Sequence, residues 1–232
     1  MNEYRYPAST TKLMTILLAT ENSSPKDVVT FTETGIRDVT WDSSNINAQL
    51  GEQMTMKDCW FAAYIKSANE VCAQIAEYVG GTEANFVAMM NQRAKELGCT
   101  HTHFANASGL PDENHYMTPY DIYLTMHAAL EYDAFREIVG SVHYDPEYKD
   151  ANGMPKKQEW TVSNKYMLGE VETPDGLRVL GGKTGTTKAA GYCLTQAAEK
   201  ESTGEEYIST VMKAKTRDDL YANMTMLLEK IH

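Results

Sequence analysis

The feature that most constrains this chain is the stretch 6–15, where Ser9 and Lys12 follow Pro7 at the head of an apolar run. That run is apolar on most sides, so it predicts a buried helix. Pro7 suits the start of the helix, where its missing N–H removes no hydrogen bond. Residues three apart share a helix face, so the Ser9 hydroxyl and the Lys12 amine can meet. An alcohol attacks well only when a base takes its proton, and a desolvated lysine can be that base.

Two later stretches complete a pattern. Ser67-Ala68-Asn69 lies between two apolar helical patterns, and Lys183-Thr184-Gly185 lies at the end of a strand-like run. Taken singly, each has an ordinary explanation, because Ser67 and Asn69 can cap a helix and Lys183 can be a solvated strand residue. In this order, however, the three motifs are the set typical of penicillin-binding proteins and class A β-lactamases.

Within that superfamily the sequence resembles the low-molecular-weight serine D-alanyl-D-alanine carboxypeptidases of peptidase family S11. The resemblance covers nearly the whole chain and, besides the three motifs, includes residues 102–111 and 183–194. It implies an α+β fold of the β-lactamase/transpeptidase type, with an antiparallel sheet, flanking helices and an all-helical subdomain. We expect a single catalytic domain over 1–232, with the helical subdomain at about 33–140 and the sheet subdomain built from 1–32 and 141–232.

The resemblance also implies an enzyme that removes the terminal D-alanine from peptidoglycan stem peptides through an acyl-enzyme. Ser9 is the expected nucleophile, Lys12 its base, and Ser67 the relay of a proton to the leaving amine. Substrate binding is expected at Asn69, Lys183, Thr184, Gly185, Thr186 and Arg217. β-Lactams are expected to acylate Ser9 by the same route, and no cofactor or metal is expected.

One position departs from the family pattern. Family members hold the substrate carboxylate with an arginine on or after the last strand. That place falls on Leu220 here, and Arg217, one turn earlier, is the expected substitute.

Two other functions stay open at this level. A class A-like serine β-lactamase needs a glutamate that activates a deacylating water. No Glu-x-x-Leu-Asn pattern occurs between the second and third motifs. A truncated, non-catalytic remnant that only binds peptidoglycan is the other alternative.

Composition limits the partners. Hydrophobic residues make up 42% of the 232, which predicts a real core, and a net charge of −11 argues against nucleic acid. No stretch approaches the roughly 18 apolar residues that span a membrane, and the residues after Met1 do not form a signal peptide. The resemblance alone implies an extracytoplasmic location.

Cysteine and histidine spacing gives no metal or disulfide pattern. Four scattered cysteines form no Cys-x-x-Cys pair. His101, His103 and His115 lack the spacing and carboxylate partners of a metal site.

The start of the chain departs from the family. Family members carry two strands before the Ser-x-x-Lys helix, whereas only residues 1–5 precede that stretch here. We therefore expect the N-terminal strands to be missing, together with the family's C-terminal domain and membrane anchor. One missing strand would lie beside the last strand of the sheet, so we expect an exposed edge at about 207–213 and a dimer through it.

Local patterns place the remaining elements. A hairpin over 142–168 is indicated by Asn152-Gly153 at its tip. Expected strands cover residues 28–32, 177–186, 192–198 and 207–213, and expected helices cover 59–65, 71–79, 83–97, 120–130 and 218–231.

Overall fold

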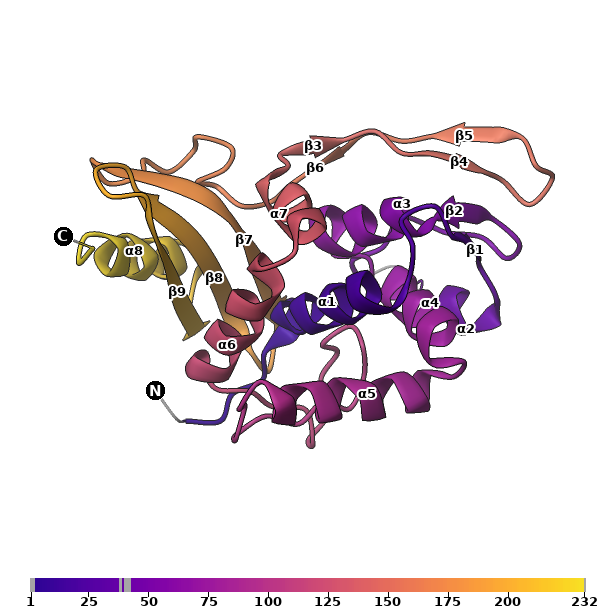
Figure 1. Cartoon of the computed structure of the whole chain (residues 1–232), viewed down its shortest axis with the longest axis horizontal. Helices are drawn as coiled ribbons and strands as arrows, with labels where there is room; N and C mark the ends of the chain where they lie inside the picture. Colours follow the sequence, from indigo (N-terminus) through magenta and orange to yellow (C-terminus); the bar gives the residue numbers. More distant parts are fainter. Residues whose placement is uncertain (1–2, 38, 40–42, 232) are drawn as a thin grey trace.

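The computed structural model describes residues 3–37, 39 and 43–231. A three-stranded antiparallel sheet stands beside a group of helices that surrounds α1 (Figure 1). Helix α8 (Arg217–Leu228) packs on one face of the sheet, and helices α6 (Pro119–Leu130) and α7 (Asp133–Gly140) pack on the other. This arrangement is α+β, as the sequence predicts.

The sheet has the order β7-β8-β9, formed by Leu177–Thr187, Gly191–Lys200 and Glu205–Ala214. Its register pairs Lys183 with Thr195 and Gly185 with Cys193, so the third motif lies on an edge strand. The three strands expected at 177–186, 192–198 and 207–213 are therefore confirmed.

Helix α1 (Lys12–Asn22) is the centre of the helical part. It begins with a 3₁₀ turn, η1 (Ala8–Thr11), and all its residues from Lys12 to Ala19 are buried. The apolar run thus gives the expected buried helix. It contacts the π-helix η2 (Ala62–Lys66), α4 (Asn69–Gly80) and α5 (Glu83–Glu96), whereas α2 (Glu33–Ile36) packs on α4 and α3 (Met56–Phe61) packs on η2 and α4.

Threonine caps begin several of these helices. The Thr55 hydroxyl accepts the Asp58 N–H while the Asp58 carboxylate accepts the Thr55 N–H, which makes a capping box. Thr82, Thr118 and Thr216 each accept the N–H three residues on. These caps satisfy donors that a helix start leaves unpaired.

Two small sheets lie at the periphery. One has the order β1-β2-β4-β5, from Val28–Thr30, Gln53–Thr55, Glu147–Lys149 and Pro155–Lys157. The other pairs β3 (His143–Tyr144) with β6 (Trp160–Thr161). Together β3 to β6 form the predicted hairpin, which reaches along the helical part in Figure 1 with its turn between β4 and β5.

The described part of the chain has two large apolar cores and a small third cluster of Ala8, Ala190 and Cys193. The larger one surrounds α1 and includes side chains of α3, α4, α5 and α6. The smaller one lies between the sheet and α8, where Leu194 packs with Leu220 and Met224. The subdomain boundaries expected from the sequence stay a prediction.

The described residues contain neither a disulfide nor a membrane-spanning helix. All four cysteines are free thiols inside the protein. Within the described ranges, none of the helices combines the length and apolar character needed to cross a membrane.

Candidate active site

Ser9 and Lys12 meet at the junction of η1 and α1. The Lys12 side chain is fully buried, and its Nζ donates to Ser9 Oγ at 3.0 Å. The same nitrogen donates to Asn69 Oδ1 at 2.8 Å and to the Ser108 carbonyl at 2.6 Å. The amine is therefore held from three directions, one of which is the Ser9 hydroxyl.

Ser67 and Asn69 face the site rather than capping the next helix. The π-helix η2 ends at Ser67, which has a left-handed backbone with φ 55°. Helix α4 begins at Asn69, and Ala68 at its N-cap makes no side-chain cap bond. The Ser67 hydroxyl accepts a hydrogen bond from Lys183 Nζ at 3.0 Å. Non-glycine residues rarely adopt this backbone, and such strain is common at functional sites.

Lys183 is a second buried amine in the site. Burial, and then the charge of Lys12, lower the pKa of Lys183 to about 7. Its Nζ also donates to the Thr184 carbonyl at 3.0 Å. Near neutral pH this amine can therefore hold or release a proton next to Ser67.

Strand β7 approaches η1 so closely that only glycine fits at position 185. A Cβ added to Gly185 would lie 2.8 Å from the Ser9 nitrogen and 3.1 Å from the Thr10 nitrogen. The absence of a side chain brings the backbone of β7 against the start of the nucleophile turn.

The loop between α5 and α6 forms hydrogen bonds with the residues that follow Ser9. Its Ser108 carbonyl holds Lys12, and its Ala107 carbonyl accepts from Thr15 Oγ1 at 2.6 Å. His115 Nε2 lies 2.9 Å from Thr11 Oγ1, and burial lowers the pKa of His115 to about 4. This histidine is thus neutral near pH 7 and ties the loop to the nucleophile turn.

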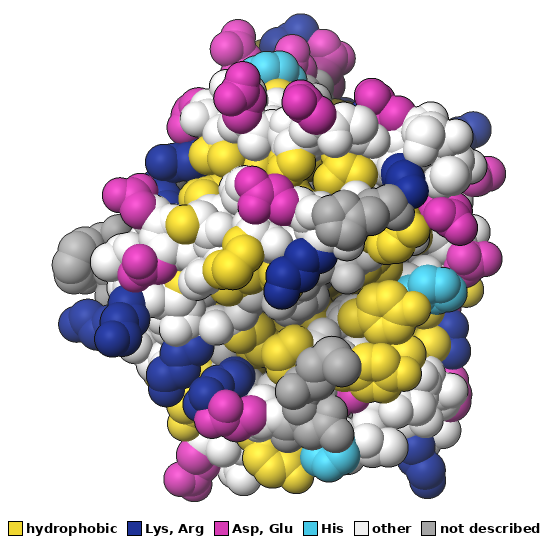
Figure 2. Space-filling model, turned by 90° about the vertical axis from the view of Figure 1, so that its left-hand side faces the viewer, with side chains coloured by type: hydrophobic (Ala, Val, Ile, Leu, Met, Phe, Trp, Pro, Cys, Tyr) yellow, Lys and Arg dark blue, Asp and Glu magenta, His cyan; other side chains and the backbone are white. Residues whose placement is uncertain are grey.

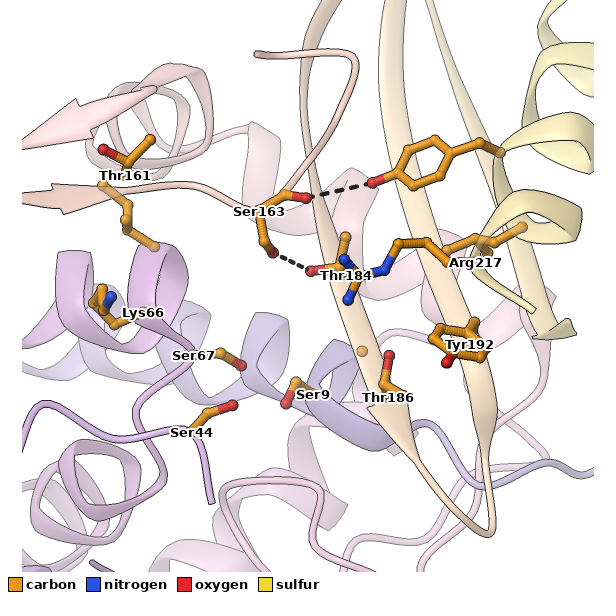
Figure 3. Close-up of a pocket in the computed structure, with 14 residues that line it drawn as sticks. Ser9, Ser44, Lys66, Ser67, Thr161, Ser163, Thr184, Thr186, Tyr192 and Arg217 are labelled. Carbon is orange, nitrogen blue, oxygen red and sulfur yellow. Dashed lines mark hydrogen bonds between the residues drawn. The ribbon is translucent and has the colours of Figure 1, made fainter. Parts of the chain in front are cut away.

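A pocket of about 330 Å³ opens over these groups (Figure 3). Six of the nine residues expected from the sequence line it: Ser9, Ser67, Thr184, Gly185, Thr186 and Arg217. The other three, Lys12, Asn69 and Lys183, reach the site through the hydrogen bonds given above. The structure therefore brings all nine together, including Arg217 from the first turn of α8.

Charge is one-sided in this pocket. Lys66 and Arg217 are the charged residues among those described that line it, and both are cations. In Figure 3 they lie at opposite ends, with Ser9 and Ser67 between them. Such a pocket attracts an anionic substrate even though the chain as a whole is acidic.

Sequence reasoning missed several residues of the site. Ser44, Lys66, Thr161, Ser163 and Tyr192 also line the pocket. The Ser163 hydroxyl lies 3.0 Å from Thr184 Oγ1 (Figure 3). The stretch 160–165 resembles the family's return toward the active site, so Ser163 could have been found from it.

Tyr64 is a further contact that the sequence did not indicate. Its hydroxyl accepts the Gly182 N–H at 3.0 Å and lies 2.8 Å from the Gly182 carbonyl and 2.9 Å from that of Val139. It thereby joins η2, which leads to Ser67, to the strand that carries Lys183.

A metal-based site finds no support in the described ranges. Nowhere in them do three or more His, Cys, Asp or Glu side chains gather as ion ligands.

A sequence profile described as D-alanyl-D-alanine carboxypeptidase matches residues 1–216. This chain belongs to peptidase family S11. Within S11 it is 32% identical over 231 residues to the D-alanyl-D-alanine carboxypeptidase DacF of Bacillus subtilis, covering 98% of this chain and 56% of DacF. It is also 32% identical over 167 residues to DacC of Escherichia coli, covering 72% of this chain and 38% of DacC.

Solved structures of two other proteins share the fold. The Streptomyces K15 DD-transpeptidase superposes with a TM-score of 0.89 at 23% identity, covering 98% of this chain and 88% of that one. The D-alanyl-D-alanine carboxypeptidase DacD of Francisella tularensis gives a TM-score of 0.81 at 25% identity, covering 99% and 65%. The β-lactamase/transpeptidase-like fold expected from the motifs is thus confirmed.

The match in length is partial. The chain spans about half the length of the curated relatives it matches, 56% of DacF and 53% of DacD from Salmonella typhimurium.

Proposed function

We propose that this chain is the catalytic part of a serine D-alanyl-D-alanine carboxypeptidase. It would remove the terminal D-alanine from peptidoglycan stem peptides through an acyl-enzyme on Ser9. The observation that carries the proposal is the pair of buried amines, Lys12 on Ser9 and Lys183 on Ser67, beneath a pocket whose lining cations suit a terminal carboxylate. The match of S11 to residues 1–216 agrees with it.

Acylation begins with a proton transfer from Ser9 to Lys12. Two of the hydrogens of a neutral Lys12 amine can point to the Asn69 amide oxygen and the Ser108 carbonyl, which lie 2.8 and 2.6 Å away. Because the nitrogen is tetrahedral, its lone pair then faces Ser9 Oγ at 3.0 Å. The oxygen that loses this proton attacks the carbonyl of the penultimate D-alanine.

Backbone N–H groups can stabilise the charge on the tetrahedral intermediate. Both main-chain groups of Gly182 bond to Tyr64, so this residue faces away from β8. Backbone directions alternate along a strand, so Thr184 and Thr186 face the same way. The Thr186 N–H can therefore form an oxyanion hole with the Ser9 N–H, at about 3 kcal/mol per donor.

The same edge of β7 can bind the substrate backbone as an added strand. Lys183, Thr184, Thr186 and Arg217 would hold the terminal carboxylate, and Asn69 the acyl-side amide. When the C–N bond breaks, Ser67 gives its proton to the leaving nitrogen and regains one from Lys183 or Lys12. Water then cleaves the ester and restores Ser9.

A β-lactamase function is not favoured. A class A enzyme uses a glutamate to activate the deacylating water, and no acidic side chain is among the described residues that line this pocket. β-Lactams would therefore acylate Ser9 and leave slowly. A remnant that only binds peptidoglycan is not favoured either, because the groups needed for acylation lie within hydrogen-bond distance of one another.

Labelling with a fluorescent penicillin tests the proposal, together with release of D-alanine from a peptide ending in D-Ala-D-Ala. We expect the parent to give both signals and Ser9→Ala to give neither, while the two proteins show the same circular dichroism. Ser141→Ala is a matched control outside the pocket and should label like the parent. Label on Ser9→Ala equal to that on the parent would refute the assignment, and rapid nitrocefin turnover would favour the lactamase.

The proposed substrate sets the proposed location. Peptidoglycan lies outside the cytoplasmic membrane, so the enzyme would act there.

The sheet edge suggests a partner. In the described part of the chain, β9 has β8 on one side and no strand on the other. The face of the molecule that includes β9 and α8 carries hydrophobic side chains among charged ones (Figure 2). An open strand edge can pair with another chain, so we propose a dimer through β9.

A further inference from the structure

Glu70 is a buried acid immediately after Asn69 in the first turn of α4. Its side chain is fully buried. One carboxylate oxygen accepts the Ile46 N–H at 2.6 Å, whereas the other is buried without a hydrogen-bond partner. A carboxylate removed from water with one oxygen unsatisfied is costly, so its presence calls for a role.

A helix start alone does not explain this burial. Acidic residues do favour the first turn of a helix, but they normally keep contact with water there. Burial raises the pKa of Glu70 to about 7, although the backbone N–H groups of Ile46, Glu70 and Ala48, and after them the charge of Lys12, act in the opposite direction. The buried carboxyl of Glu70 and the amine of Lys12 therefore interact electrostatically.

Glu70 also seats a segment of the pocket wall. The Ser44 carbonyl accepts the Asn69 N–H at 2.8 Å, and Ser44 lines the pocket. Two residues further on, Ile46 is held by Glu70 through its N–H and by Gln158 through its carbonyl at 3.1 Å. The segment 44–46 is thus fastened to the start of α4 at both ends.

We propose that Glu70 is a positioning residue for acylation. Resting on the proposed function, this role has two parts: Glu70 holds the segment 44–46 against the start of α4 at the pocket wall, and while it is ionised it sets the pH above which Lys12 becomes the neutral base. It touches neither the substrate nor the reacting atoms.

Other ionisable groups around this pair come from several elements. The charge of Lys12 lowers the pKa of Lys183 in β7 and of His115 in the α5–α6 loop. The charge of Glu70 raises the pKa of Tyr148 in β4, and Cys72 in α4 raises the pKa of Lys183. His115 is neutral near pH 7 and the pKa of Tyr148 is raised. Of these groups, Lys183 therefore has a pKa in the same range as that of Glu70, so its protonation is coupled to that of Lys12 and Glu70.

The test is the pH dependence of penicillin acylation in Glu70→Gln. Glutamine keeps the shape and an acceptor for Ile46 but removes the charge. The rate constant should rise with pH as Lys12 loses its proton, and without the nearby anion this rise should move to lower pH by about one unit. A Glu70→Asp variant keeps the charge on a shorter side chain. Its midpoint should stay near that of the parent while its plateau rate falls.

Glu52→Gln is the matched control. Glu52 is also buried and accepts the Gln49 N–H, but its ion pair is with Lys156. Its removal should lower the melting temperature and leave the midpoint of acylation unchanged. A parent-like midpoint in Glu70→Gln, or an equal shift in Glu52→Gln, would overturn the proposal. A parent that is not acylated at any pH would instead refute the proposed function.

A second measurement covers the case in which Glu70→Gln does not fold. Coupling is reciprocal, so Lys12 must act on Glu70 as Glu70 acts on Lys12. In protein labelled with ¹³C at glutamate carboxyls, we expect one resonance to titrate near pH 7. In Lys12→Met that midpoint should rise. No change in the midpoint would contradict the coupling.

Discussion

Burial shifts three ionisable groups near Ser9, namely Lys183, His115 and Glu70, toward their neutral forms. It lowers the pKa of Lys183 to about 7 and of His115 to about 4, and raises that of Glu70 to about 7. The common cause is loss of water around the charged form. Near neutral pH the site therefore carries less charge than its residue types suggest, which suits a mechanism that moves protons between lysine and serine.

His115 gives a stability prediction at the scale of one residue. The pKa of a histidine in an unfolded chain is about 6.5, whereas the pKa of His115 in the folded protein is about 4. Between these values the unfolded chain binds a proton that the folded state refuses. The stability from this group is therefore complete above the unfolded pKa and falls as the pH drops toward the folded one. From pH 7 to pH 5 the loss should be about 2 kcal/mol.

Urea unfolding of the parent and of His115→Gln at both pH values checks this loss. The difference between the two proteins should change with pH by that amount. Using the difference removes the contribution of Glu70, whose raised pKa acts with the opposite sign. A difference that is equal at pH 7 and pH 5 would show that His115 is not held neutral.

At the scale of elements, the contact between β7 and η1 sets the shape of the site. Gly185→Ala would place a methyl group 2.8 Å from the Ser9 nitrogen. Either the strand or the nucleophile turn must move, and small displacements of reacting groups are expensive. Penicillin acylation should fall at least about 10²-fold.

A nearby glycine supplies the control for this substitution. At Gly140 the closest atom to an added Cβ is the Leu180 carbonyl oxygen at 3.7 Å, an ordinary contact. Gly140→Ala should therefore acylate like the parent. Acylation of Gly185→Ala at the same rate as Gly140→Ala would mean that the close approach has no functional weight.

Elements with strong local signals could be predicted from the sequence. The apolar run after Ser9 and the Asn152-Gly153 turn each fix structure within a few residues. Helix α7 was not predicted, although Phe135, Ile138 and Val139 have helical spacing and are buried. Only two residues separate α6 from α7, so the sequence gives no clear boundary between the two helices.

Other features depend on contacts distant in the chain. The π-helical turn before Ser67 has no distinctive sequence, because an apolar run is equally suited to an α-helix. Glu70 has the sequence position of an exposed acid at a helix start, but in the fold it is buried and accepts the N–H of Ile46, a residue distant in the chain. The same holds for Ser44, which reaches the pocket by folding back onto α4.

At the scale of the whole molecule, the open edge of β9 predicts self-association. Sedimentation equilibrium of the chain should show a dimer, and Tyr207→Lys on β9 should weaken it because charge blocks edge pairing. Tyr78→Lys, on exposed helix surface, is the control and should not. A chain that is monomeric at all concentrations would contradict the dimer without affecting the proposed chemistry.

The measurement that tests the account most directly is the mass of the intact chain after reaction with benzylpenicillin, followed by mapping of the adduct. The three motifs converge on one hydroxyl, so we expect one penicillin per chain, attached to the peptide that contains Ser9. Formation should slow as the pH falls, because Lys12 must give up its proton first. An adduct on any other residue, or an unmodified chain under conditions in which the fold is intact, would contradict the account.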